Sequence, residues 1–214
     1  IEKNNGHTIY EIELPASSKD IAGFVLQVRG TAYLYDAYYF TEVEEDGINP
    51  VKLVLSTTTF KKEEYIVPNI DLVKREVLGS SDPVAKSFHM FVVDNGCTLD
   101  AEALSDDGVT VLPNKNVGGA GGFARGMMEA LANSEGFTHI LLMDDDVKVS
   151  AESLKRTFNL LALAQGDYRD AFINGAMLAI EQPNLQFEDV SFVIKSGAYR
   201  RVKEDKLYVD QIKD

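Results

Sequence analysis

A glycine-rich stretch that leads through a helix-like segment and an apolar run into three aspartates constrains this chain more than any other feature. It covers residues 114–146. Four of the five residues from Gly118 to Gly122 are glycine, so the backbone there can adopt positive φ and approach a ligand closely. Residues 123–132 are rich in helix formers, with apolar side chains at helical spacing. We therefore expect a glycine-rich binding loop followed by a short amphipathic helix.

The apolar run and the aspartates behind it predict a strand that ends in a cation site. Residues 138–143 have the length and apolar character of a parallel strand covered on both faces. In an extended backbone alternate side chains share a face, so we expect Asp144 and Asp146 to point one way and Asp145 the other. Two carboxylates that close repel each other unless a proton or a cation joins them. Oxygen ligands select a hard divalent ion such as Mg²⁺ or Mn²⁺.

Both features also have simpler interpretations. A run of three acids is often a solvated loop, and a run of glycines is often a flexible surface loop. Ligands of open α/β sheets bind outside the carboxyl ends of the strands, and this position favours metal binding by the aspartates.

Charge and composition exclude several classes of partner. The 214 residues include 21 basic and 34 acidic ones, and the formal net charge of −13 argues against DNA or RNA as the main partner. No apolar run approaches the roughly 18 residues of a membrane-spanning helix, and we expect no signal peptide. Cys97 is the only cysteine, so an internal disulfide is impossible and a reducing compartment, the cytoplasm, is expected.

A change in composition predicts two domains with a boundary at residue 48. Residues 1–48 carry short runs of β-branched and aromatic side chains broken by Pro15, Gly23 and Gly30, which is typical of antiparallel strands. We expect part of a β-sandwich there, and an α/β domain over residues 49–214. The chain begins with Ile1 rather than Met and has no Trp, so we expect a fragment. We expect the β-sandwich to be incomplete and the α/β domain to be incomplete at its C-terminal end.

Polar side chains follow the other strands that the sequence predicts. These buried-type strands cover residues 51–56, 87–93 and 109–112. Thr59 and Lys62 follow the first and could hold a base, a ribose or a phosphate, although for this motif alone a solvated loop is the favoured interpretation. Asp94 and Asn95 follow the second, where Asp94 could accept from a ribose hydroxyl or a base N–H. An Asx turn that caps its own backbone explains this pair equally well. Together the strand ends predict one crevice.

Five motifs in this order resemble those of a known enzyme family. They are STTTFKKEEY from Ser56, VVDNG from Val92, NVGGAGGFARGM from Asn116, LLMDDD ending at Asp146 and INGAML from Ile173. The chain is similar to the inverting glycosyltransferase family 2, which uses nucleotide sugars and has the GT-A fold. The likeness is greatest to its galactofuranosyltransferase-like members, which carry a β-sandwich ahead of the transferase domain. This resemblance implies an α/β fold with a mostly parallel sheet flanked by helices.

The resemblance also implies roles for individual residues. Thr59, Phe60 and Lys62 match positions that contact the uridine and its diphosphate, and Asp94 matches the acid that meets the uracil. Asp144 and Asp146 resemble the pair that binds Mn²⁺ or Mg²⁺, a cation that neutralises the leaving UDP. The implied donor-binding residues are Thr59, Phe60, Lys62, Asp94, Asn95, Asn116, Gly118, Gly119, Asp144 and Asp145.

The reaction implied is an inverting transfer in which a general base deprotonates the acceptor hydroxyl. The implied partners are a UDP sugar, for example UDP-galactofuranose, and a glycan or lipid-linked glycan acceptor of a growing cell-surface polymer. The resemblance places this reaction in the cytoplasm or at the inner face of the membrane, and it is compatible with peripheral membrane association and a homo-oligomer. The family's downstream acidic motif with tryptophans and its later metal-binding histidine have no match here, so no catalytic base is assigned.

Two other classes of function stay open. Gly119, Gly121 and Ala124 fit the GxGxxA pattern of an NAD(P)-dependent oxidoreductase, although the glycines begin six residues after the predicted strand. A non-catalytic carbohydrate-binding protein would use the tyrosine-rich N-terminal part. An aspartate-nucleophile phosphatase is disfavoured because Lys148 stands where Thr or Val is expected.

Overall fold

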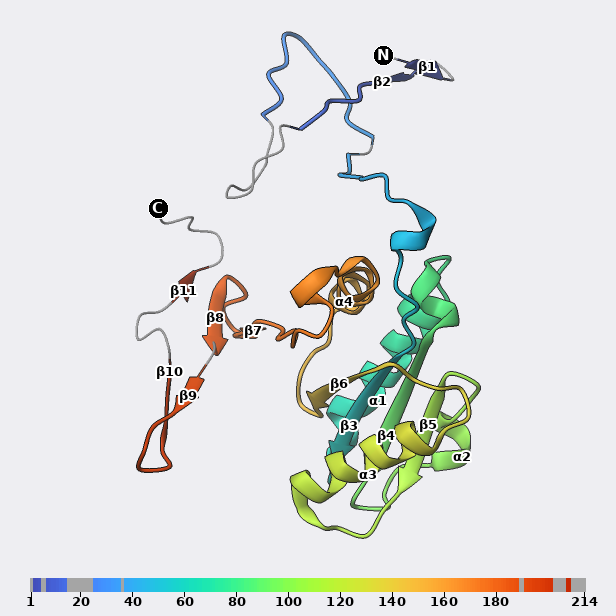
Figure 1. Ribbon diagram of the computed structural model, residues 1–214, viewed down its shortest axis with the longest axis vertical. Coiled ribbons are helices and arrows are strands. Elements are labelled where there is room, and N and C mark those ends of the chain that lie inside the picture. Colours follow the sequence, from blue (N-terminus) through green and yellow to red (C-terminus); the bar gives the residue numbers. More distant parts are fainter. Residues whose placement is uncertain are drawn as a thin grey trace. The chain divides into compact units, whose positions relative to one another are not determined.

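The computed structural model describes residues 2–4, 7–14, 25–35, 37–188, 191–201 and 207–208 (Figure 1). The chain divides into two compact units, Ile1–Glu42 and Val43–Asp214. In the first unit β1 (Glu2–Asn4) and β2 (His7–Ile9) pair as an antiparallel hairpin. Pro15 and Gly23 of the predicted β-sandwich lie outside the described residues. The sandwich and its boundary at residue 48 stay predictions.

A four-stranded parallel sheet forms the centre of the second unit, in the order β5-β4-β3-β6. Its strands are β3 (Leu53–Thr59), β4 (Phe88–Asp94), β5 (Val109–Pro113) and β6 (His139–Asp144). Thr59 pairs with Asp94, Asp94 with Pro113, and Thr58 with Asp144, so all four strands end at one edge. The predicted α/β class with a parallel sheet is therefore confirmed, while the GT-A fold stays a prediction.

Helices cover both faces of this sheet (Figure 1). In chain order the helical elements of the sheet domain are α1 (Glu63–Leu72), the π-helical η2 (Val73–Leu78), η3 (Pro83–Lys86), α2 (Ala101–Leu104), α3 (Gly118–Ala132) and α4 (Ala151–Leu163). The short elements outside it are η1 (Glu45–Gly47), η4 (Gly166–Tyr168), β7 (Met177–Leu178), β8 (Leu185–Glu188), β9 (Ser191–Val193), β10 (Tyr199–Arg201) and β11 (Leu207–Tyr208). Among the described residues no helix has the length and apolar character needed to cross a bilayer.

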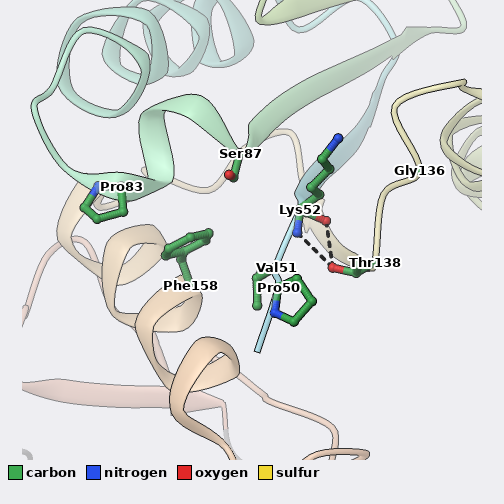
Figure 2. Close-up of a pocket in the computed structure, with 8 residues that line it drawn as sticks. All are labelled: Pro50, Val51, Lys52, Pro83, Ser87, Gly136, Thr138 and Phe158. Atoms are coloured by element: carbon green, nitrogen blue, oxygen red, sulfur yellow. Dashed lines mark hydrogen bonds between the residues drawn. The ribbon is translucent and has the colours of Figure 1, made fainter. Parts of the chain in front are cut away.

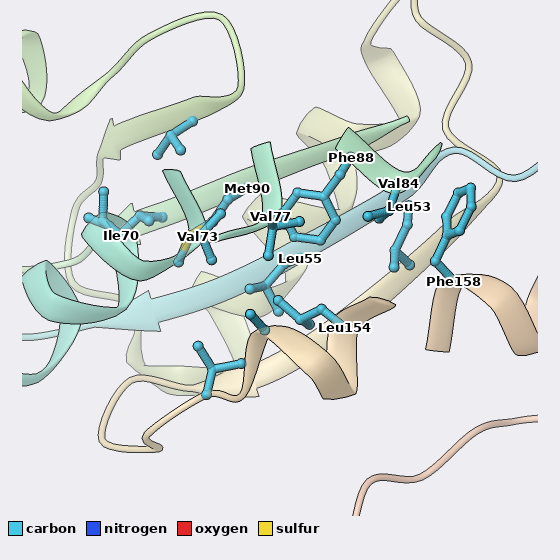
Figure 3. Close-up of a cluster of buried hydrophobic side chains, with 14 of the residues drawn as sticks. Leu53, Leu55, Ile70, Val73, Val77, Val84, Phe88, Met90, Leu154 and Phe158 are labelled. Atoms are coloured by element: carbon cyan, nitrogen blue, oxygen red, sulfur yellow. The ribbon is translucent and has the colours of Figure 1, made fainter. Parts of the chain in front are cut away.

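The larger hydrophobic core lies between the sheet and the layer of α1, η2 and α4 (Figure 3). Alternation along β3 directs Leu53 and Leu55 into this core, while Val54 faces the opposite side of the sheet. The helical contribution recurs at helical spacing and includes Ile66, Ile70, Val73, Val77, Leu154 and Phe158. On the opposite face Val54 packs with Phe91 of β4 and Ala130 of α3 in a smaller cluster.

The glycine-rich segment is helical, which differs from the predicted loop. α3 begins at Gly118, so the glycines form its first turns. A Cβ on Gly122 would collide with Thr58, and a Cβ on Gly126 would collide with Ser56. These two glycines let α3 lie directly on β3, and this tertiary contact compensates for the poor helix propensity of glycine. Gly119 has open space around it.

β6 also differs from its prediction as a strand covered on both faces. Within the described part of the chain it pairs only with β3, so it forms an edge of the sheet. Leu141 and Met143 pack on the larger core, whereas Leu142 on the other face is 48% exposed.

His89 is a buried imidazole on the α3 side of the sheet. Its Nε2 lies 2.9 Å from the Thr110 hydroxyl, and its ring centroid lies 4.6 Å from that of Phe91 and 5.8 Å from that of Phe137. Burial lowers the pKa of His89. The folded protein therefore keeps this imidazole neutral at pH values where the unfolded chain protonates it.

We expect the close helix–strand contact to be measurable in a double-mutant cycle. Gly126→Ala should lower the free energy of unfolding by about 1–3 kcal/mol, because the new methyl group overpacks against Ser56. Ser56→Ala removes a hydroxyl without a hydrogen-bond partner and should restore a large part of this loss in the double variant. Gly119→Ala, which adds a methyl group in open space, is the matched control and should not destabilise the protein. Additive effects of Gly126→Ala and Ser56→Ala in urea denaturation would contradict the contact.

Stability should fall as the pH is lowered below about 6.5, the usual pKa of an unfolded histidine. In that range the unfolded chain binds a proton that buried His89 resists, so the free energy of unfolding decreases. His89→Gln should show a smaller decrease between pH 7 and 5.5 in urea denaturation. His139→Gln removes an imidazole at the start of β6 and controls for the loss of a histidine as such. Equal pH dependence in wild type and His89→Gln would refute this role.

Candidate functional site

Polar side chains gather where the parallel strands end. Thr59 closes β3 beside Asp94 of β4, and Asp144 closes β6 beside Thr58. The loop after β3 carries Lys62, which precedes α1. The last residue of β6 and the turn that follows it, residues 144–147, are called the aspartate turn. The sheet therefore brings together side chains that are far apart in the sequence, as the strand pattern predicted.

Lys62 is the cation around which two carboxylates meet. Its Nζ lies 2.8 Å from Asp146 Oδ2 and 3.3 Å from Asp145 Oδ1. The hydrogen bond to Asp146 is the main reason why the pKa of the Lys62 ammonium is raised, and the same bond lowers the pKa of Asp146. Both partners are thereby favoured in their charged forms.

The aspartate turn does not continue the extended backbone of β6. The strand ends at Asp144, and Asp145 and Asp146 form a turn, so the strict alternation of faces that we expected is lost. Asp145 is 8% exposed, whereas Asp144 and Asp146 are exposed. The structure joins Asp145 and Asp146 through Lys62, and the assignment of Asp144 and Asp146 as metal ligands stays a prediction.

The aspartate turn offers carboxylates that a divalent ion could use. Asp145 and Asp146 share the positive charge of Lys62, while Asp144 and Asp146 are exposed. Among the described residues no group of three or more His, Cys, Asp or Glu side chains is arranged to hold a metal ion. Mg²⁺ is usually held by one or two carboxylates and completes its octahedron with water and phosphate oxygens. Asp144 and Asp146 could supply such ligands, and the metal site stays a prediction.

Asp94 is held by its own loop. It is 1% exposed, and its Oδ1 accepts from the Gly96 N–H at 2.9 Å. Its Oδ2 accepts from the N–H groups of Thr98 and Leu99 at 2.7 and 2.9 Å. This geometry supports the alternative in which Asp94 caps its own backbone, and it leaves little of the carboxylate for a ligand.

An amide network fixes the start of α3 to the end of β4. Asn95 is 6% exposed; its Nδ2 donates to the Gly118 carbonyl at 3.1 Å, and its Oδ1 accepts from Asn114 Nδ2 at 2.8 Å. Asn116 Oδ1 accepts from the Gly118 N–H at 3.0 Å, where Gly118 has φ of +77°. Asn95 and Asn116 thus shape the first turn of α3, while Gly118 and Gly119 are exposed at this edge.

The loop after β3 exposes an aromatic ring, and β3 itself contains buried hydroxyls without a hydrogen-bond partner. Phe60 is 47% exposed, and the Lys61 Nζ lies 5.3 Å from its ring centroid. The buried hydroxyls of β3 that lack a hydrogen-bond partner belong to Ser56, Thr57, Thr58 and Thr59. A buried hydroxyl without a partner is costly. Thr59 is the last residue of β3 and is 2% exposed, so its hydroxyl is closed to a ligand in this conformation.

A glycine-rich dinucleotide loop is not supported by this geometry. Gly119 and Gly121 lie inside α3 rather than in a turn between strand and helix. Residues 114–117 separate the end of β5 from the start of α3, whereas a dinucleotide loop needs its glycines directly after the strand.

Two asparagines of the site escaped the sequence analysis. Asn114 stands in the Asn95 network, and Asn69 of α1 bonds to the chain behind the aspartate turn. Asn69 carried a readable signal, because it is a polar residue on the buried stripe that contains Ile66 and Val73. Asn114 carried none beyond its place before the glycines.

A hollow of about 390 Å³ lies at the amino end of the sheet, opposite the strand ends of the candidate site (Figure 2). Its lining residues are Pro50, Val51, Lys52, Pro83, Ser87, Gly136, Thr138 and Phe158. The Lys52 ammonium donates to the Glu135 carbonyl at 2.7 Å. None of the predicted site residues lines this hollow, and its wall is largely apolar.

Comparison with curated proteins finds partial similarity to two galactofuranosyltransferases. Galactofuranosyltransferase GlfT2 of Mycolicibacterium smegmatis is 30% identical over 117 residues, which are 55% of this chain and 17% of the relative. The GlfT2 protein of Mycobacterium tuberculosis is 36% identical over 69 residues, which are 32% of this chain and 10% of the relative. No family model matches the chain. The chain thus spans less than a fifth of either relative, and the similarity indicates a glycosyltransferase-like protein.

The cap that Asp94 provides should be visible in stability. Asp94→Asn leaves one side-chain oxygen for three backbone N–H groups, so we expect a loss of about 2–4 kcal/mol in the free energy of unfolding. Asp100→Asn in the same loop is the control, because Asp100 caps α2 through one bond, to the Ala103 N–H, and Asn caps helices equally well. Thermal and urea unfolding that rank the two variants alike would contradict the cap.

Proposed function

We propose that this chain carries the donor-binding part of a metal-dependent, inverting glycosyltransferase with the GT-A fold. The observation that carries the proposal is the meeting of Asp145 and Asp146 on the Lys62 ammonium at the carboxyl ends of the parallel strands. Open α/β sheets bind their ligands at this edge. The partial similarity to galactofuranosyltransferases supports a sugar donor and a glycan acceptor as the general partners.

The proposed donor is a UDP sugar, with UDP-galactofuranose as the first candidate. Lys62 places a positive charge at the site, and its ammonium can donate to phosphate oxygens. Thr59 has an unpaired hydroxyl at the end of β3, but at 2% exposure it can serve a phosphate only after the strand end opens. The half-exposed ring of Phe60 can cover the base.

Asp144 and Asp146 would hold Mn²⁺ or Mg²⁺, with Asp145 fixed beside them against Lys62. When bound, this cation supplies positive charge that stabilises a diphosphate leaving group. The Lys62 ammonium would stabilise the negative charge of the same diphosphate from the β3 side of the site. The general base that takes the proton of the acceptor hydroxyl is not assigned to any described residue.

The acceptor is proposed to be a glycan or lipid-linked glycan of a cell-surface polymer, reached from the cytoplasmic face of the membrane. The first turn of α3 is exposed and would leave room for the acceptor, because Gly118 and Gly119 have open space around them. Peripheral membrane association and a homo-oligomer belong to the same proposal.

Calorimetric titration tests the donor site. UDP should bind with Mn²⁺ present and at least tenfold more weakly in EDTA, because the carboxylates and the phosphates share the cation. Asp146→Asn should abolish most of this metal dependence. Asp71→Asn, an exposed carboxylate of α1 outside the site, is the matched control and should bind as wild type does.

NADH is the competing ligand for the oxidoreductase alternative, and a carbohydrate-binding protein would have no use for UDP. Binding of NADH without any effect of metal would refute the proposal. Metal-dependent binding of UDP that survives unchanged in Asp146→Asn would refute the site assignment.

A further inference from the structure

One side chain of α1, Asn69, bonds two backbone groups at the end of the aspartate turn, the carbonyl of Val147 and the N–H of Val149. Asn69 Nδ2 donates to the Val147 carbonyl at 2.7 Å, and Asn69 Oδ1 accepts from the Val149 N–H at 3.2 Å. Asn69 is 4% exposed and Val149 is 9% exposed, so these bonds lie inside the protein. The segment between β6 and α4 has neither strand nor helix to pair its backbone. Asn69 therefore replaces a ladder of backbone hydrogen bonds there.

The chemistry of this contact requires an amide. A carboxamide has a donor and an acceptor on one short side chain, so it can satisfy a carbonyl and an N–H two residues apart. A carboxylate at position 69 would face the Val147 carbonyl without a proton to donate, and an aliphatic side chain would leave both backbone groups unpaired. Buried backbone groups without partners are rare because they cost free energy.

The residue that precedes the same helix contacts the carboxylates of the aspartate turn. Lys62 precedes α1 and contacts Asp145 and Asp146, while Asn69, seven residues later, holds Val147 and Val149. Lys62 is the N-cap residue of α1, and Asn69 lies inside the helix. The two side chains thus bond the chain at the carboxylates and directly after them.

We propose that Asn69 is a positioning residue for the carboxylates of the aspartate turn, a role that rests on the proposed function. It touches neither donor nor metal. It fixes the backbone of residues 147–149 and so the path of the chain directly after Asp145 and Asp146. Without it the segment between β6 and α4 keeps the side-chain contacts of Lys62 with Asp145 and Asp146 but loses the bonds that hold its backbone to α1.

Two substitutions and one matched control test this role. Asn69→Leu has similar size but neither donor nor acceptor. Asn69→Asp keeps the shape and an acceptor but loses the donor, and it serves if the leucine variant fails to fold. Ile70→Ala, at the next position of α1, weakens the larger core and leaves the aspartate turn untouched.

The first readout is hydrogen exchange of the backbone amides of residues 145–149, measured where all variants are folded. Asn69→Leu should exchange at least tenfold faster there than Ile70→Ala does, because it loses the bonds to both Val147 and Val149. Asn69→Asp loses only the bond to the Val147 carbonyl and should exchange faster than Ile70→Ala by a smaller factor. Equal exchange in this segment would overturn the role, whatever the protein binds.

The second readout is the ratio of UDP affinities measured with Mn²⁺ and with EDTA. This ratio should fall at least tenfold in the Asn69 variants and remain within twofold of wild type in Ile70→Ala. Affinity for uridine, which has no phosphate, should stay within twofold in all variants. An unchanged ratio in the Asn69 variants would overturn the role of Asn69 as a positioning residue. If the wild-type protein showed no metal-dependent UDP binding, the proposed function would be refuted, and the hydrogen-exchange readout alone would decide on Asn69.

Discussion

The parallel pairing of β3 with β4 and β6 is the constraint on which the rest of this structure depends. It aligns Thr59 with Asp94 and Thr58 with Asp144, so the last residues of three strands lie at one edge. Thr59, Asp94 and Asp144 are the last residues of these strands, and Lys62, Asn95 and Asp146 follow them closely. In an acidic chain this edge gathers carboxylates, and Lys62 supplies the charge that makes their proximity tolerable.

Two helices then define the edge from opposite faces of the sheet. α1 and its N-cap residue hold the aspartate turn through Asn69 and Lys62. α3 lies on β3 through Gly122 and Gly126, and Asn95 bonds its first turn. One helix thus contacts the chain that carries the charged groups, and the other packs its backbone directly on β3.

The sequence was sufficient for the features that depend on local pattern. Apolar runs located the four parallel strands, and polar residues behind them located the edge. It failed where tertiary contact decides the conformation. The glycines predicted a loop because glycine has a poor helix propensity. They are helical because Gly122 and Gly126, which lack a Cβ, let α3 pack directly against Thr58 and Ser56 of β3.

The aspartates show the same limit on a smaller scale. Alternation of faces predicts the direction of side chains only while a strand continues, and β6 ends at Asp144. The spacing of Asp94 allowed both a ligand contact and a cap, and only the three N–H groups around its carboxylate separate them. Asn69 could be noticed as a polar residue on a buried stripe, but its partners lie about 80 residues away.

Anomalous scattering from manganese in crystals grown with UDP tests the central claim most directly. The account predicts one manganese peak within about 2.2 Å of an Asp144 or Asp146 carboxylate oxygen, shared with the diphosphate of UDP. It also predicts the Lys62 ammonium within reach of the same phosphates. UDP bound elsewhere, for example in the hollow beside Phe158, or a peak absent from the aspartate turn, would contradict it.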